Sequence, residues 1–187
     1  MAVLGLGEET MRIELFDARE ITSEQISALK SLSTAVYPPE STLNWPGQTI
    51  EWATPQWRTF CRDERGDVLS HVGIFLRQGQ INGIPVTIGG IGQVLTHPDS
   101  RRQGLASKGI ERSIDLFRDQ GVDFALLVCE PNLVPMYQKL NWQSFLGTLL
   151  VKQRGIPGRF TFNLPMTIGV LSKNPSEGTI DLMGPPW

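Results

Sequence analysis

The sequence predicts an α+β fold in which helices flank a mixed, mostly antiparallel central sheet. Three observations predict this class. Alternating stretches rich in β-formers, separated by turn signals, run from residue 57 to residue 96 and favour antiparallel neighbours. An amphipathic helix is expected from residue 102 or 104 to about residue 120, with Gly121 as its end. The continuous apolar run at 124–129 is typical of a buried central strand.

The first third of the chain is predicted to hold a loose tail at residues 1–10, a strand at 11–17 and a helix. Alternating side chains favour the strand. The helix is expected to begin at Thr22, because Gln25 lies three residues later as in a capping box, and to reach Val36. A proline pair follows, and residues before proline avoid the α region.

Residues 38–55 contain four prolines, and a long irregular segment of this kind is often a binding loop. A short helix is expected near 48–53. Aromatic faces beside carboxylates can hold a cationic ligand. The candidate substrate-binding residues of this segment are Glu40, Trp45, Glu51 and Trp52. A loop pinned by two buried tryptophans explains the same residues equally well.

Three strands are predicted at 57–62, 68–80 and 84–96, with Asn82-Gly83 as a tight turn because both residues tolerate positive φ. The third of these strands contains three glycines, which mark a bulge or the close approach of another backbone or a ligand. They are Gly89, Gly90 and Gly92.

The C-terminal third is predicted to hold a short helix at 132–140 and strands at 142–153 and 159–171, followed by the closing segment 178–187. A length of 187 residues fits one domain over residues 1–187.

Composition excludes several classes of function. The chain has 17 Lys and Arg against 19 Asp and Glu. It is therefore a poor candidate for binding nucleic acids, because such binding relies on positive side chains that neutralise phosphates. No run reaches the ~18 apolar residues of a membrane span, and the N-terminus lacks signal-peptide features, so a cytoplasmic protein without a membrane partner is expected. Two cysteines and two histidines offer no metal site of recognisable spacing. Whether the chain forms a homodimer stays open.

The segment from Val94 to Ser107 is predicted to be a strand–loop–helix junction that holds a pyrophosphate. Free N–H groups and the helix dipole attract an anion to a helix N-terminus. Gly104 has no Cβ to block the approach of a phosphate, while Arg101 and Arg102 add charge. The alternative is an ordinary helix start that happens to contain glycine and arginine.

The hexapeptide RRQGLA at 101–106 resembles motif A of the GNAT acetyltransferase superfamily, (Q/R)-x-x-G-x-(G/A). This resemblance implies a GNAT-like sheet with a V-shaped opening between two central strands, and acetyl-CoA as co-substrate without a metal. It also implies that the strand end at 94–96 pairs with the pantetheine arm. The implied cofactor-binding residues are Val94, Leu95, Thr96, Arg101, Arg102, Gln103, Gly104, Leu105, Ala106, Ser107 and Asn132.

The segment 137–142 resembles the family's Y-x-K-x-G-(F/W) element, with Asn141 where glycine is usual. The resemblance gives Tyr137 the role of general acid that protonates the departing CoA thiolate. A phenol of ordinary pKa, ~10, holds its proton at neutral pH. A tyrosine that only packs in the core is the alternative.

Within the superfamily, the Pro-rich segment and the tail resemble aminoglycoside 2′-N-acetyltransferases and, more distantly, nodulation N-acyltransferases. The resemblance implies that Asp181 and the carboxylate of Trp187 bind a cationic sugar amine, with the latter as a base. A tail packed for stability is the alternative. Those enzymes carry a glutamate where this chain has Gly92, so the base comes from Glu40, Glu51, Asp181 or the Trp187 carboxylate, or else the acceptor differs.

Together these residues predict an N-acetyltransferase that moves an acetyl group from acetyl-CoA directly to a primary amine, such as an amino sugar or another small cationic amine. Backbone N–H groups at 94–96 are expected to polarise the thioester carbonyl. Cys129 has no identifiable histidine partner and is a poor nucleophile candidate. The alternative is a non-catalytic acyl-CoA-binding or sensing domain.

Overall fold

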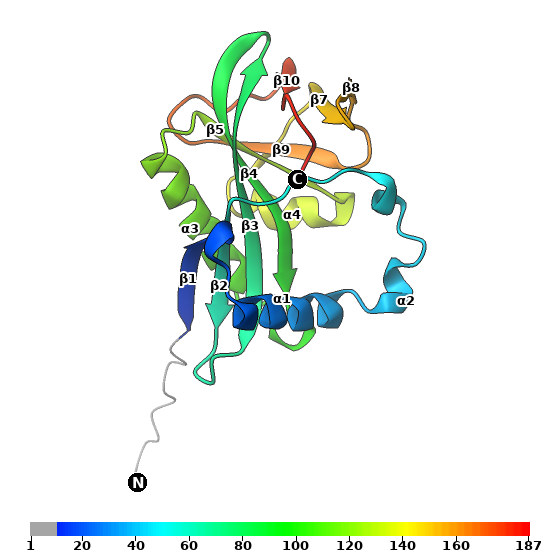
Figure 1. Ribbon diagram of the computed structural model, residues 1–187. Helices are drawn as coiled ribbons and strands as arrows, with labels where there is room; N and C mark the ends of the chain where they lie inside the picture. The colour runs from blue at the N-terminus through cyan, green and yellow to red at the C-terminus, as the bar shows by residue number, and fades with distance from the viewer. Residues whose placement is uncertain (1–10) are drawn as a thin grey trace.

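The computed structural model describes residues 11–187, and the predicted loose tail at 1–10 lies outside the described residues (Figure 1). One mixed sheet of ten strands runs β6-β9-β5-β4-β3-β10-β7-β8, and β2 and β1 extend it from β3. The strands are β1 (Arg12–Asp17), β2 (Trp57–Arg62), β3 (Val68–Ile81), β4 (Ile84–Thr96), β5 (Phe124–Cys129), β6 (Gln143–Ser144), β7 (Thr148–Gln153), β8 (Ile156–Arg159), β9 (Leu164–Gly169) and β10 (Thr179–Asp181). Most neighbours are antiparallel, which confirms the predicted fold class.

The helices are α1 (Ser23–Val36), α2 (Pro39–Thr42), α3 (Leu105–Asp119) and α4 (Val134–Gln138), with short 3-10 turns between elements. The N-terminus of α1 is closed by the predicted capping box, in which Thr22 and Gln25 exchange backbone and side-chain hydrogen bonds. In the described part of the chain, no helix is long and apolar enough to span a membrane.

The helices cover both faces of the sheet. On one face, Ile110, Ile114 and Phe117 of α3 pack into the larger core cluster. On the other face, α1 crosses the strands and buries Leu32 against Phe60 (Figure 1). The chain end lies over this second face as well. We call it the α1 face below.

The two parallel central strands, β4 and β5, separate partway along their length. Paired residues run only from Ile88↔Phe124 to Ile91↔Leu127, although β4 continues to Thr96 and β5 to Cys129. Just beyond the last pair, a register shift in the β3–β4 ladder and a φ of 51° at Gln93 mark a bulge. The predicted V-shaped opening is therefore present, and it leaves one edge of β4 without a backbone partner.

The structure corrects three predicted elements: the helix near 48–53 and the strands at 142–153 and 159–171. The predicted helix near 48–53 is wrong: α2 lies earlier, and a 3-10 turn occupies Pro46–Thr49, each beginning at a proline that suits a first helical turn. The predicted strand 142–153 is divided into β6, at one end of the sheet, and β7, which lies next to the end strand β8 on the other side. The break contains Gly147, where a Cβ would lie 2.0 Å from the carbonyl oxygen of Gly178.

The predicted strand 159–171 is shortened to β9, Leu164–Gly169, because β8 already ends at Arg159. The closing segment adds a strand that the sequence analysis did not predict. β10 lies between β3 and β7, antiparallel to the first and parallel to the second. This pairing directs the remaining residues, 182–187, back across the α1 face.

Candidate active site

The N-terminus of α3 has the geometry of an anion site. The loop from β4 enters the helix through two left-handed residues, Arg102 with φ 63° and Gly104 with φ 76°. Gly104 is the N-cap, and no side chain caps this 15-residue helix, in contrast to α1. A Cβ on Gly104 would meet nothing within 4 Å. The first N–H groups of α3 therefore remain available to a phosphate or diphosphate.

The other predicted cofactor-binding residues surround this loop. Arg101 lies on the surface, where its Nε donates to the carbonyl oxygen of Thr96 at 3.4 Å. Gln103 and Asn132 are exposed, and Ala106 and Ser107 lie half-buried in the first turn of α3. Two side chains point elsewhere. Leu105 is buried, and Leu95 packs in the small core under α1, so either could meet a cofactor only through its backbone.

Tyr137 lies in α4 with only 4% of its surface exposed, and it contacts Trp142 edge-to-face with ring centroids 6.4 Å apart. Burial raises the pKa of this phenol well above its ordinary value, and nearby Cys129 and Tyr37 raise it further. Tyr137 thus keeps its proton throughout the neutral range, as a general acid must. Asn141 has a φ of 64°, the conformation for which the family motif uses glycine.

Cys129 is not activated. Burial raises its pKa to about 11, and the thiol donates to the sulfur of Met166 at 3.7 Å. A neutral thiol is a weak nucleophile. Within residues 11–187, no three His, Cys, Asp or Glu side chains gather so that they could hold a metal ion.

Trp187 occupies the space over β4 that is left free because positions 90 and 92 are glycine. Its indole stacks on Phe75, with centroids 5.5 Å apart and planes inclined by 16°, and its Nε1 donates to the carbonyl oxygen of Leu126 at 3.0 Å. A Cβ on Gly90 would lie 2.2 Å from the ring, and one on Gly92 would lie 2.9 Å from the main-chain carbonyl carbon of Trp187. The close approach predicted at these glycines is therefore that of Trp187. On the other face, a Cβ on Gly89 would meet Phe117.

The tail that carries Trp187 is held along its length. The carbonyl oxygen of Pro186 accepts from the N–H of Ala53 at 2.7 Å, and that of Pro185 accepts from Nη1 of Arg77 at 2.5 Å. The Arg77 guanidinium also lies 5.0 Å from the Trp187 ring centroid. The carbonyl group of Trp187 is thus fixed over Gly92, the position at which the resemblance places a catalytic glutamate.

The tryptophans of the irregular segment pin it in place. Trp45 and Trp52 stack with centroids 6.0 Å apart, and Phe160 and Phe162 contact them edge-on. Trp52 Nε1 donates to the carbonyl oxygen of Gly47 at 2.9 Å. These contacts pin the segment as the second alternative expects, but neither tryptophan is fully buried, since Trp52 is half-buried and Trp45 keeps 39% of its surface exposed. Substrate binding by the two tryptophans stays a prediction.

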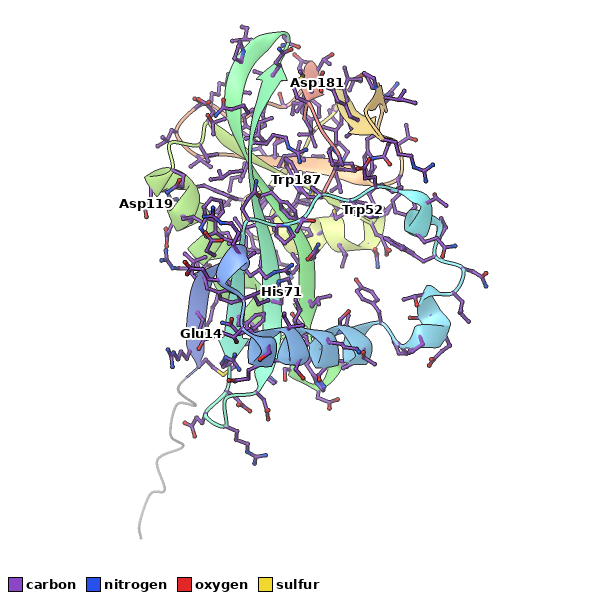
Figure 2. All side chains as sticks on the ribbon, in the orientation of Figure 1. Glu14, Trp52, His71, Asp119, Asp181 and Trp187 are labelled. Carbon is purple, nitrogen blue, oxygen red and sulfur yellow. The ribbon has the colours of Figure 1, made fainter. Side chains whose placement is uncertain are left out.

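The predicted acidic ligands do not converge. Glu51 accepts the N–H of Arg154 at 2.5 Å, which fastens the loop to the turn between β7 and β8. Glu40 is exposed on α2. Asp181 accepts the N–H of Met183 at 2.7 Å, and Figure 2 shows it far up the sheet from Trp187.

A polar cluster beside the bulge, formed by buried His71, half-buried Arg58 and exposed Gln93, is the feature that the sequence analysis missed. His71, 1% exposed, donates from Nδ1 to the carbonyl oxygen of Gln93 at 2.8 Å and accepts at Nε2 from Nη1 of Arg58 at 3.0 Å. Nη1 of Arg58 also donates to Oε1 of Gln93 at 3.2 Å. Burial, and then the charge of Arg58, lower the pKa of His71 to about 3, so its ring is neutral. The available signal was Arg58 itself, a charge on the same strand face as buried Phe60.

Comparisons with known proteins identify the family. Residues 17–145 match the model described as an acetyltransferase (GNAT) domain. The chain therefore belongs to the GNAT acetyltransferase family. No curated protein matches the sequence.

Several solved structures share the fold. A GNAT family N-acetyltransferase (YhbS) from Escherichia coli, in complex with CoA, superposes with a TM-score of 0.62 at 14% identity, covering 94% of this chain and 91% of that chain. An acyl-CoA N-acyltransferase from Pseudomonas aeruginosa gives 0.58 at 16% identity, over 84% and 99%. A GNAT family acetyltransferase from Brucella melitensis, in complex with acetyl-CoA, gives 0.56 at 12% identity, over 90% and 94%.

Proposed function

We propose that this protein is an acetyl-CoA-dependent N-acetyltransferase that transfers the acetyl group directly to a primary amine. The observation that carries the proposal is the uncapped N-terminus of α3 beside two parallel strands that separate after Ile91 and Leu127. Membership of the GNAT family supports it, as do fold relatives solved with CoA and with acetyl-CoA.

The residues present fit such a co-substrate. The free N–H groups at 105–107 and the exposed charges of Arg101 and Arg102 suit a diphosphate. The unpaired edge of β4 beyond Ile91 suits the amide groups of a pantetheine arm, which can add to a sheet edge as a strand does. When bound, acetyl-CoA supplies an activated thioester.

In the proposed reaction, backbone N–H groups at 94–96 polarise the thioester carbonyl, and the neutral amine attacks its carbon. A C–N bond forms, and the C–S bond then breaks with its electron pair remaining on sulfur. Tyr137 donates its proton to that sulfur. The nitrogen releases one proton to solvent as the amide forms, and the Tyr137 phenolate takes up a proton from solvent before the next cycle. Burial raises the pKa of this phenol, which keeps it protonated at neutral pH and also makes it a weaker acid than an exposed tyrosine.

The amine must lose a proton before it attacks. We propose the carboxyl group of Trp187 as the base, a role that requires this residue to carry a free α-carboxylate. Its carbonyl carbon lies 2.9 Å from the place of a Cβ on Gly92, so a glutamate side chain and this carboxyl group could not both occupy the site. Glu51 and Asp181 support the role less well, because each already accepts a backbone N–H.

For the acceptor, we propose a small primary amine. The tail alone, through its resemblance to aminoglycoside 2′-N-acetyltransferases, suggests an amino sugar, and the comparisons with known proteins lend the aminoglycoside assignment no support. A second candidate function is an acyl-CoA sensor without turnover. The observation that favours it is Gly92, which has no side chain to act as a base.

The test combines CoA binding and thiol release. Acetyl-CoA or CoA is expected to raise the melting temperature, since a ligand that binds only the folded state stabilises it, and a panel of amines is expected to release thiol. Stabilisation without thiol release for any amine would support the sensor. Absence of both effects would overturn both functions.

A further inference from the structure

Arg58 is a partly buried cation that the chain itself does not neutralise. Burial lowers its pKa, but a guanidinium stays charged at any physiological pH. Among residues 11–187, no carboxylate pairs with it. Only Nη1 makes hydrogen bonds, to His71 and Gln93, and Nε is closed off from solvent without an acceptor. Removing part of a charge from water without a counter-ion is costly, and an anion bound beside Arg58 would lower that cost.

This cation lies beside the candidate acceptor site. Arg58 pairs with Gly73 across β2 and β3, and Gly73 pairs with Gly92 across β3 and β4. Two strand spacings, about 10 Å, therefore separate the backbones of Arg58 and Gly92. The Arg58 side chain shortens this gap, because it reaches the side chain of Gln93, the residue next to Gly92. In Figure 2, His71 lies nearer α1 than Trp187 does.

A second arginine adds positive charge to this face, beside the carboxyl group of Trp187 that we propose as the base. Arg77 lies two positions beyond Phe75 on the α1 face, over the Trp187 ring, and burial also lowers its pKa. Within the described residues it has no carboxylate partner either. Of the acids expected to attract a polycation, Glu51 and Asp181 accept backbone N–H groups and Glu40 is exposed on α2, which leaves the Trp187 carboxylate on this face.

We propose that Arg58 determines acceptor specificity by binding an anionic group on the acceptor, a carboxylate or a phosphonate, several bonds from the reacting amine. The inference rests on the proposed N-acetyltransferase function. Nη2 of Arg58, which makes no hydrogen bond to the described chain, donates to that group. His71 is the positioning residue: its neutral ring holds Nη1 and leaves the rest of the guanidinium for the acceptor.

The first experiment uses the unmodified protein. Thiol release from acetyl-CoA is measured with amino carboxylates of increasing length, from glycine to 6-aminohexanoate, each against its carboxamide, and with aminomethylphosphonate and kanamycin. For the best chain length, the amino carboxylate is expected to give a kcat/KM at least about tenfold above its carboxamide, since a charge-assisted hydrogen bond is lost in the latter. Equal or better turnover of the carboxamide or of kanamycin would overturn the proposal.

The second experiment uses R58Q and R58K, with R65Q at the exposed β2–β3 turn as the matched control. R58Q is expected to raise KM for the amino carboxylate about tenfold or more, with kcat and the carboxamide kinetics little changed, and R58K is expected to keep part of the preference. An equal loss for both acceptors would overturn the proposal. CoA-induced stabilisation shows whether each variant is folded.

The two proposals can fail separately. If no amine releases thiol, N-acetyltransfer is wrong, and the same ligand pairs are titrated calorimetrically into the CoA-saturated protein. A carboxylate preference that R58Q abolishes would support the anion site without catalysis. Equal or undetectable binding of both ligands would overturn it.

Discussion

The indole of Trp187 occupies the volume that a side chain at Gly90 would need, with ring atoms 2.2 Å from the place of a Cβ. The ring of Trp187 therefore fits against β4 only because position 90 is glycine. In a close-packed core, the ring could not move far enough to make room for a methyl group there.

Gly90→Ala tests this fit. The added methyl group must displace the ring, and overpacking of this kind costs about 1–3 kcal/mol of unfolding free energy. Chemical denaturation should show this loss, and thiol release should fall with it because Trp187 is displaced from over Gly92. Gly158→Ala is the control, because a Cβ there meets nothing within 4 Å. A Gly90→Ala protein as stable and active as the wild type would contradict the assignment.

Gly104→Ala tests the anion site of α3. A φ of 76° costs alanine about 1–2 kcal/mol, and the methyl group would project into the space proposed for the diphosphate. We expect a raised KM for acetyl-CoA, measured at saturating amine. Gly121→Ala at the far end of α3 is matched, since its φ is 70° and its Cβ is equally unobstructed. It should lose comparable stability and keep its KM. Equal effects on KM would reject the site.

Tyr137→Phe tests the general acid. Loss of proton donation to the thiolate is expected to lower kcat about 10²- to 10⁴-fold at unchanged CoA binding. Because burial raises the pKa of Tyr137, activity of the wild type that depends on this proton should persist above pH 10 and fall only at higher pH. Tyr37→Phe, the other tyrosine of the chain, should change kcat far less. Unchanged kcat in Tyr137→Phe would exclude the role.

The lowered pKa of His71 predicts that the folded protein loses stability in acid. Its pKa is about 3 in the folded protein, against an ordinary 6.5. Below pH 6.5 the unfolded chain therefore binds a proton that the folded protein does not, so stability falls by about 1.4 kcal/mol per pH unit towards pH 3. Denaturation from pH 7 to 4 should show a shallower slope for His71→Gln, and His97→Gln, at the half-exposed loop after β4, should keep the full slope. If the His71→Gln variant shows the same slope as the wild type, the ring of His71 is not held neutral in the folded protein, and its proposed role in positioning Arg58 is wrong.

Local sequence pattern predicted the elements that depend on local chemistry. The Thr22–Gln25 capping box, the Asn82-Gly83 turn, with φ values of 51° and 81°, and the amphipathic face of α3 are all decided by neighbours within a few residues. The loop into α3 belongs to this group, because its glycine and its position after a strand are visible in the chain itself.

What the pattern could not predict depends on contacts between distant segments. β10 is three residues long and exists because β3 and β7 flank it. The split of 142–153 follows from the crossing of the tail at Gly147. The cluster of Arg58, His71 and Gln93 joins three strands, and the position of Trp187 over Gly92 depends on the register of the whole sheet. Such placements are set by tertiary packing.

The glycines of β4 have a consequence for the history of the family. A relative that has a side chain at the position of Gly90 must lack the aromatic ring at position 187 or place its tail elsewhere. A relative that has a glutamate at the position of Gly92 must move the main chain of residue 187. These positions should therefore change together, as coupled pairs in an alignment of relatives, with intermediate sequences rare because a clash at either site removes most of the packing at once.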